Sequence, residues 1–123
     1  MIDKRNFYIN GKWVAPSKPN DFEVINPSNE EPFAIISLGD VADTNSAVKA
    51  AKESLTSWGK TSKEERISFI QKLYKIYKSR WDEMAKVISM EMGAPLDYAS
   101  SAQTASGASH IEDFIKRLKD FKF

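Results

Sequence analysis

The sequence predicts an α+β segment in which short antiparallel β-hairpins are followed by three to four helices. Four of the five prolines lie in the first 39 residues, among short apolar runs that are typical of strands. From residue 40 onward, apolar residues recur at three- and four-residue steps, as on one face of a helix. The length of 123 residues suits one domain. We therefore expect a single segment, with strands in 1–39 and helices in 40–123.

The predicted strands form two hairpins. The first turns at Asn10 and Gly11, and Asn-Gly is a strong hairpin signal because a type I′ turn needs a positive φ at both central positions. Residues 26–32 link the second, longer hairpin. The strands are expected at Phe7–Ile9, Lys12–Val14, Phe22–Ile25 and Phe33–Ser37. A lone two-stranded hairpin is marginal in water, so the first hairpin needs a packing partner.

Capping residues mark the ends of the first two helices. Asp40 is the expected N-cap of the first helix, and Asp43 three residues later comes close to a capping box. Gly59 is expected to end this helix as a C′ glycine. Ser62 and Glu65 have the S-x-x-E spacing of a capping box, which predicts the start of the second helix.

The second helix is expected to be buried on much of its surface. Its apolar stripe consists of Ile67, Ile70, Tyr74, Tyr77 and Trp81, widened by Phe69, Leu73 and Ile76. A break is expected near Ser79 and Arg80, after which a helix continues to a stop at Gly93. Pro95 suits the first position of the last helix, because its missing N–H has no helical partner there.

The last helix begins with small residues and becomes amphipathic. Nearly all side chains in 99–109 are small, which lets another helix, or the wall of a channel, lie close. Of these two interpretations the close helix contact is favoured. The apolar side of the amphipathic part consists of Ile111, Phe114, Ile115, Leu118 and Phe121.

Composition excludes several classes of function for this chain acting by itself. There is no cysteine, which removes thiolate zinc sites and cysteine nucleophiles, and His110 is the only histidine. The glycines form no phosphate-binding or nucleophile-elbow motif. A net charge of +1 gives no general attraction to nucleic acid or to an anionic membrane. With no apolar run near the length of a transmembrane helix and no signal-peptide core, we expect a soluble, cytoplasmic protein.

The remaining charged groups are interpreted as structural. We expect the pairs Glu30–Glu31 and Glu64–Glu65 to be a solvated turn and a partner of the helix dipole, rather than acid–base catalysts. The basic stretch 116–123 suggests nucleic-acid or membrane binding, but Asp120 interrupts it, so a solvated helix face is favoured. The residues alone thus indicate no catalytic or cofactor-binding side chain.

Four stretches of the sequence, in this order, resemble the N-terminal segment of the NAD(P)-dependent aldehyde dehydrogenase superfamily. They are YINGKWV, INPSNEEPFAIISLGDVADTNSAVKAA, SWGKTSKEERISFIQKLYKIYKSRWDEMAKVISMEMGAP and ASSAQ. Each motif is weak alone, but the order and spacing are specific, and the resemblance covers essentially all of the chain. It implies the N-terminal part of the cofactor-binding domain of such an enzyme, so that the α+β segment is part of an α/β fold.

The resemblance implies a reaction that this chain cannot perform alone. In the family, a cysteine thiolate attacks the aldehyde, hydride passes to NAD or NADP, and glutamate-activated water releases the carboxylic acid. We expect those groups to lie beyond residue 123, so this segment alone is expected to be inactive and to bind no nucleotide. Its implied partners are the remainder of the chain, the aldehyde substrate and further copies in a homo-oligomer, with no nucleic acid and no membrane.

Two sets of site residues are carried over from the family. A monovalent cation, Na+ or K+, is implied at the backbone carbonyls of Val24 and Ile25 and the carboxylate of Glu91, for which a solvated or capping role is the alternative. The helix of small residues is implied to line the substrate tunnel, with Ala102 and Ser106 facing it one turn apart. Small side chains there favour a bulkier aldehyde.

An alternative function is a free-standing, non-catalytic interaction module or truncated remnant. In either case the helices lack the parallel sheet on which they rest in the family. Exposed apolar faces and self-association are therefore expected. Phe7, Ile9 and Trp13 are among the first places where such exposure is predicted.

Overall fold

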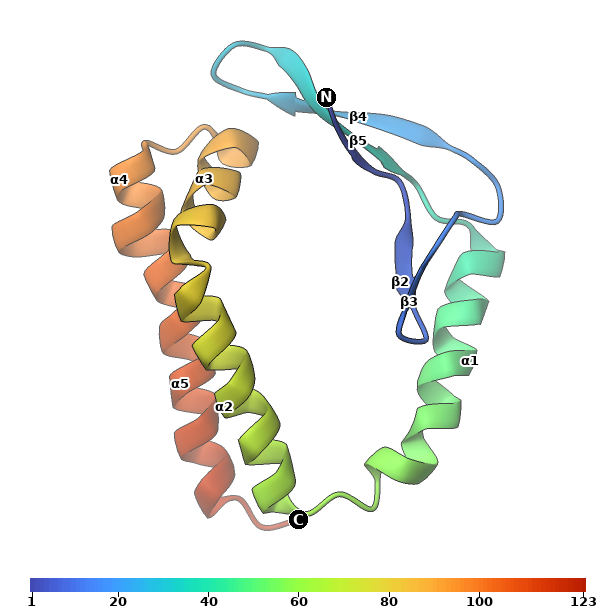
Figure 1. Cartoon of the computed structure of the whole chain (residues 1–123), viewed down its shortest axis with the longest axis vertical. Helices are drawn as coiled ribbons and strands as arrows, with labels where there is room; N and C mark the ends of the chain where they lie inside the picture. Colours follow the sequence, from blue (N-terminus) through green and yellow to red (C-terminus); the bar gives the residue numbers. More distant parts are fainter. The chain divides into compact units, whose positions relative to one another are not determined.

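The computed structural model describes all residues from 1 to 123 and divides into two compact units, Met1–Lys60 and Thr61–Phe123. The first, which we call the N-terminal unit, contains all five strands and one long helix; the second, the helical unit, contains only helices (Figure 1). Strands thus precede residue 38 and helices follow residue 40. The compact units nevertheless separate at residue 60, because the first helix packs against the first hairpin.

The first hairpin consists of β2 (Phe7–Ile9) and β3 (Lys12–Val14), as predicted. Asn10 and Gly11 have φ of 53° and 73°, the two positive values that a type I′ turn requires. Across the hairpin, Tyr8 pairs with Trp13, and their rings meet edge to face with centroids 5.2 Å apart. Trp13 is 68% exposed, as expected, whereas Phe7 and Ile9 are half-buried.

The larger sheet has the strand order β1–β5–β4. Antiparallel β4 (Asp21–Asn26) and β5 (Glu31–Ser37) form the predicted second hairpin, and β1 (Ile2–Lys4) adds to β5 in parallel. No local pattern in the sequence predicted β1, since a parallel strand depends on a partner far along the chain.

A bulge interrupts the β4–β5 pairing. Val24 pairs with Ala34, whereas the next residue, Ile25, pairs with Pro32, so Phe33 is the extra residue. Pro32 lies beyond the end of β1, where its missing N–H removes no bond to that strand.

Helix α1 (Val41–Trp58) begins with the capping pattern expected at Asp40. The Asp40 carboxylate accepts hydrogen bonds from the N–H groups of Ala42 and Asp43, and the Asp43 carboxylate accepts from the Asp40 N–H. The helix ends before Gly59, but the prediction of a left-handed C′ glycine is wrong, because φ there is −61°. A Cβ on Gly59 would lie 2.9 Å from the Leu55 carbonyl oxygen, so space favours glycine.

In the helical unit, α2 (Lys63–Ser79) and α3 (Trp81–Met92) meet at Arg80, where the break was predicted. The Ser62–Glu65 capping box is confirmed, with both reciprocal hydrogen bonds present. Gly93 ends α3 in the left-handed conformation, φ 72°. Pro95 occupies the N-cap of α4 (Leu96–Tyr98) instead of the predicted first helical position.

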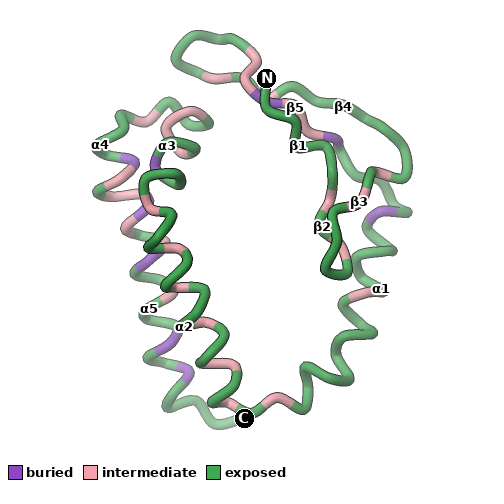
Figure 2. The backbone as a smooth tube through the Cα atoms, in the orientation of Figure 1, coloured by how far each residue is buried: buried purple, intermediate pink, exposed green.

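The α2 surface is less buried than predicted. The residues of the central stripe, from Ile67 to Trp81, are half-buried, but Phe69, Leu73 and Ile76 are 54%, 53% and 46% exposed. The fully buried positions of this unit instead concentrate on α5 and the segment before it (Figure 2). Phe69, Leu73 and Ile76 therefore face away from the packing partner α5, and the prediction that they are buried is wrong for this chain. No helix is long and apolar enough to span a bilayer.

Candidate functional site

The small-residue segment contains a π-helical turn that the sequence did not indicate. Residues Ala99–Thr104 form this turn, η1, which continues directly into α5 (Ala105–Asp120). In a π-helix each hydrogen bond spans five residues, one more than in an α-helix. The buried positions follow that change of spacing, with a step of five from Ala99 to Thr104 and then α-helical steps through Ala108, Ile115 and Leu118.

The close helix contact expected for the small residues is confirmed. Helix α3 packs against η1, and α2 packs against α5. Ala85 and Ala99 are almost fully buried at the first contact, where their small side chains allow a close approach. The buried face of the small-residue segment is thus occupied by its own neighbouring helices.

One end of the π-turn is held by Tyr77 of α2. Its hydroxyl donates a hydrogen bond to the Thr104 carbonyl oxygen at 3.0 Å. One turn later, Gly107 faces the same tyrosine, and a Cβ at this glycine would overlap the hydroxyl and lie 3.1 Å from Cζ. The absence of a side chain at Gly107 therefore gives the tyrosine room to reach the backbone.

The other end of the turn is held by Trp81, the first residue of α3. Its indole N–H donates to the Ser100 hydroxyl at 3.1 Å. The rings of Tyr77 and Trp81 also meet edge to face, with centroids 6.3 Å apart. Two aromatic side chains in contact with each other thus bind both ends of η1.

Two buried polar atoms in η1 have no hydrogen-bond partner in this chain. They are Oε1 of Gln103 and Oγ1 of Thr104, and Thr104 is 0% exposed. The Gln103 amide donates to Sδ of Met92 at 3.6 Å, a weak interaction. Buried polar groups are normally paired, so these two atoms mark a place where a further hydrogen-bond partner would fit the chemistry of the turn.

The predicted tunnel residues are not among the fully buried positions of this segment. Ala102 is half-buried within η1 and Ser106 is exposed in the first turn of α5. Neither belongs to the buried face that runs from Ala99 to Ala108. The wider π-turn also changes the angle between these two side chains from that of a regular α-helix.

The predicted cation ligands belong to different units. Val24 and Ile25 lie on either side of the bulge in β4, in the N-terminal unit, and Glu91 is exposed in the last turn of α3, in the helical unit. Pro32 opposite Ile25 has no N–H to offer β4. Backbone carbonyls and a carboxylate suit a hard cation. No cluster of three or more histidine or acidic side chains provides a metal site elsewhere.

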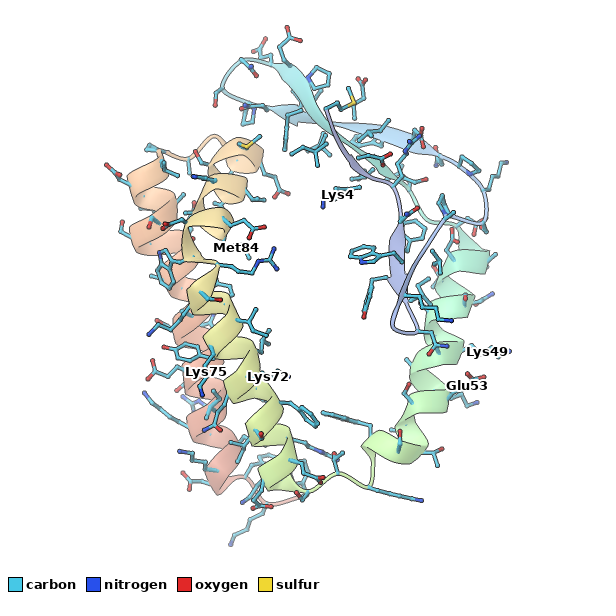
Figure 3. The ribbon with its side chains drawn as sticks, in the orientation of Figure 1. Lys4, Lys49, Glu53, Lys72, Lys75 and Met84 are labelled. Atoms are coloured by element: carbon cyan, nitrogen blue, oxygen red, sulfur yellow. The ribbon has the colours of Figure 1, made fainter.

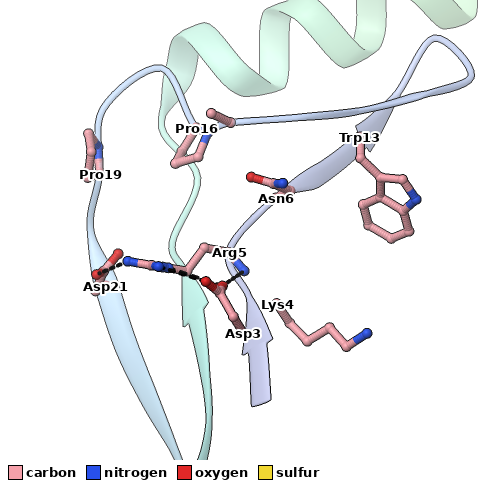
Figure 4. Close-up of a pocket in the computed structure, with 9 residues that line it drawn as sticks. Asp3, Lys4, Arg5, Asn6, Trp13, Pro16, Pro19 and Asp21 are labelled. Carbon is pink, nitrogen blue, oxygen red and sulfur yellow. Dashed lines mark hydrogen bonds and ion pairs between the residues drawn. The ribbon is translucent and has the colours of Figure 1, made fainter. Parts of the chain in front are cut away.

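A pocket of about 360 Å³ lies in the N-terminal unit beside β1 (Figure 4). Arg5 donates to both carboxylate oxygens of Asp3 and to Asp21, at 2.7–3.2 Å. These hydrogen bonds lower the pKa of Asp3 to about 2 and raise the pKa of Arg5 above its ordinary value. Asp3, Arg5 and Asp21 are therefore paired with one another, and Lys4 is the remaining charged side chain that lines the pocket.

Comparison with known proteins finds similarity along the whole chain. The model of the aldehyde dehydrogenase family matches residues 13–122. A 3-succinoylsemialdehyde-pyridine dehydrogenase from a Pseudomonas species is 39% identical over 124 residues, covering 100% of this chain and 26% of that protein.

Solved structures agree with this match. An aldehyde dehydrogenase from Bartonella henselae is 54% identical with a TM-score of 0.98, covering 100% of this chain and 26% of that one. Aldehyde dehydrogenase C from Pseudomonas syringae, a mutant in complex with NAD+ and octanal, is 35% identical with a TM-score of 0.94, covering 97% and 24%. The chain thus spans about a quarter of the length of the relatives it matches.

Proposed function

Because the chain belongs to the aldehyde dehydrogenase family, we propose that it serves as the N-terminal part of an enzyme that oxidises an aldehyde to a carboxylic acid with NAD(P)+. The observation that carries the proposal is the match of 100% of this chain to 26% of an aldehyde dehydrogenase structure, with a TM-score of 0.98 and 54% identity. The oxidised nicotinamide supplies the hydride acceptor when bound. The cysteine nucleophile has to come from the rest of such an enzyme, since none of these 123 residues is cysteine.

The exposed apolar faces support a role as part of a larger assembly. On α1, Val41, Val48 and Leu55 recur every seven residues and are all exposed. The same helix also carries an exposed ion pair, in which Lys49 and Glu53 lie 4.0 Å apart (Figure 3). On α2, Leu73 and Ile76 are exposed in the same way. Exposed apolar side chains that gather on one face of a helix are typical of an interface, so we propose that the remainder of the enzyme covers these faces.

The helix of small residues is proposed to form part of the substrate tunnel. Ala102 and Ser106 lie off the buried face of their helix, which leaves them available to a substrate. Their small side chains favour a bulky aldehyde. The variants Ala102→Leu and Ser106→Met, made in an active enzyme, are expected to lower kcat/KM for bulky aldehydes more than for short ones; an unchanged preference would contradict this assignment.

A monovalent cation, Na+ or K+, is proposed at the carbonyls of Val24 and Ile25 with the Glu91 carboxylate. The support is the bulge between the first two residues and the oxygen chemistry of all three ligands. Replacing Glu91 by Gln is expected to weaken the stabilisation of the enzyme by KCl against heat, relative to choline chloride. Equal salt responses in the two proteins would argue against the site.

A chimera tests the proposed function directly. These 123 residues replace the corresponding quarter of the Bartonella henselae enzyme, and NADH or NADPH formation is followed by absorbance with a panel of aldehydes. We expect a folded chimera that oxidises aldehydes, and no reduced nucleotide from the 123-residue chain alone. A folded chimera that binds NAD+ but oxidises no aldehyde would overturn the proposal, as would turnover by the isolated chain.

A further inference from the structure

We propose that Tyr77 is a positioning residue for the small-residue helix: its hydrogen bond to the Thr104 carbonyl holds the π-turn of η1 and thereby determines which small side chains face the substrate. The effect on substrate rests on the proposed function, whereas the effect on the helix does not. Tyr77 lies on α2, and we expect it to contact neither aldehyde nor nucleotide.

The first support is the hydrogen bond itself. A π-turn shifts the backbone hydrogen bonds of a helix by one residue, which is unfavourable unless another group compensates. The Tyr77 hydroxyl donates to the Thr104 carbonyl oxygen at 3.0 Å, at the last residue of the π-turn and the junction with α5. Thr104 is 0% exposed, so water has little access to this junction if the tyrosine is removed.

The second support is Gly107. Glycine is unfavourable in a helix interior, and Gly107 lies in the first half of α5 with no positive φ to require it. Space gives the reason, because any Cβ there would overlap the Tyr77 hydroxyl. The sequence thus accepts a poor helix former where the tyrosine needs room to reach the π-turn.

The third support is the second anchor. Trp81 donates to Ser100 at 3.1 Å, at the opposite end of the same turn, and its ring contacts that of Tyr77. In a regular α-helix the residue that shares a face with Thr104 is the one four positions earlier, which is Ser100. Ser100 would then replace Ala99 on the buried face. Ser100 would lose its place beside the indole, and Ala102 would rotate relative to Ser106. Both anchors therefore favour the π register.

The test uses the same chimera, carrying Tyr77→Phe, Gly107→Ala, or both, with Tyr74→Phe as the matched control. Tyr74 lies one turn away on the same helix, half-buried, and packs beneath Lys78 through its ring, which phenylalanine retains. Hydrogen–deuterium exchange of peptides within 96–110 reports on the turn. The ratio of kcat/KM for a long and a short aldehyde reports on the substrate.

Tyr77→Phe is expected to raise exchange in 99–108 up to about tenfold, the effect of losing one net hydrogen bond, and to change the aldehyde ratio several-fold with the KM for nucleotide unchanged. Tyr74→Phe should change neither. Gly107→Ala should perturb the turn more in the wild-type background than in the Tyr77→Phe background, because the overlapping hydroxyl is absent from the latter.

Unchanged exchange in Tyr77→Phe would overturn the inference. So would faster exchange with an unchanged aldehyde ratio, since the tyrosine would then support the fold without positioning the substrate face. If the chimera binds NAD+ but oxidises no aldehyde, while Tyr77→Phe still loosens the turn, the proposed function fails and the holding of the π-turn by Tyr77 stands.

Discussion

The two units of the chain bury different kinds of residue. In the N-terminal unit the buried positions are Ala34 and two polar residues, Ser37 and Asp43; in the helical unit four of the six buried positions are alanine, leucine or isoleucine from η1 and α5. Ser37 accepts a hydrogen bond from the Asn20 N–H at 3.0 Å, and Asp43 accepts one from the Ser17 N–H at 2.8 Å. The N-terminal unit is thus held by polar groups that tie loops down, and the helical unit by close apolar packing.

This difference explains why the turns and caps that hold the N-terminal unit are easier to predict from the sequence than the close packing of the helical unit. Turn and cap chemistry involves residues two to four positions apart, and such patterns can be recognised in a linear sequence. Close packing joins residues far apart along the chain, for which no local pattern exists. Breaking one contact of each kind tests whether the two units depend on these interactions to different degrees.

The largest effect is expected from Leu118→Ala in α5. Leu118 is buried, so the change removes apolar contacts and leaves a cavity, costing about 2–5 kcal/mol in the free energy of unfolding. Urea denaturation of the 123-residue chain, followed by far-UV circular dichroism, measures this loss. Phe114→Ala in the same helix is the control: at 55% exposure it should cost much less. Equal losses would show that Leu118 is not part of the packed face of α5.

The next effect is expected from Asp43→Ala in the N-terminal unit. The carboxylate accepts from the N–H groups of Ser17 and Asp40 at 2.8 and 3.1 Å, so its loss leaves two donors unpaired and costs about 1–3 kcal/mol. Hydrogen exchange in the loop 15–20 should rise with the loss of stability. Asp43→Asn keeps one acceptor oxygen and should retain part of the protection from exchange. Wild-type exchange rates in this loop of Asp43→Ala would show that the carboxylate does not hold the loop in place.

A gain in stability is expected from Glu30→Gly. Glu30 closes the turn after β4 with φ 60°, and its N–H donates to the Asn26 carbonyl oxygen at 2.8 Å. A residue with a side chain is disfavoured in this left-handed conformation by roughly 1–2 kcal/mol, part of which glycine loses again through its greater freedom in the unfolded chain. We expect a rise in Tm of a few degrees. Glu30→Ala, which keeps a Cβ, should give no such rise.

The smallest effect is expected from acid on the edge of the sheet. The pKa of Asp3 is lowered from 3.8 to about 2 by hydrogen bonds from Arg5, so its contribution to stability is present above about pH 4 and is lost as the pH falls toward 2. Amide protection of β1 should therefore fall over that range. Asp3→Asn should show weak protection of β1 already at about pH 5, with little further change; the same acid dependence in that variant would assign the transition to another group.

The sequence predicted the elements that local chemistry determines. The Asn10–Gly11 turn, both capping boxes and the end of the helix at Gly93 all follow from residues within one turn of one another. Strand β1 could not be predicted, because its only pairing is with β5, far along the chain. The exposure of Phe69 likewise depends on which partner is present, and apolar periodicity does not report that.

Much of the candidate site depends on contacts between distant residues. The π-turn arises where Tyr77 and Trp81 meet residues that lie 27 and 19 positions later in the chain. The local signal that could have pointed to it is Gly107, a glycine inside a helical pattern. The positions of Ala102 and Ser106 were expected from the family resemblance, but the spacing between them assumed a regular α-helix. The extra residue of the π-turn changes that spacing, and no sequence periodicity indicated it.

Strand β1 has a consequence for how the chain acquires its structure during synthesis. Protein chains emerge from the ribosome N-terminus first, and Ile2–Lys4 pair only with Ala34–Ile36. Strand β1 must therefore wait, unpaired, until both strands of the second hairpin have been made. We expect the nascent chain to form its two hairpins in order of synthesis and to add β1 to the larger sheet after them. An extension fused ahead of Met1 would join the chain directly at this late-forming edge.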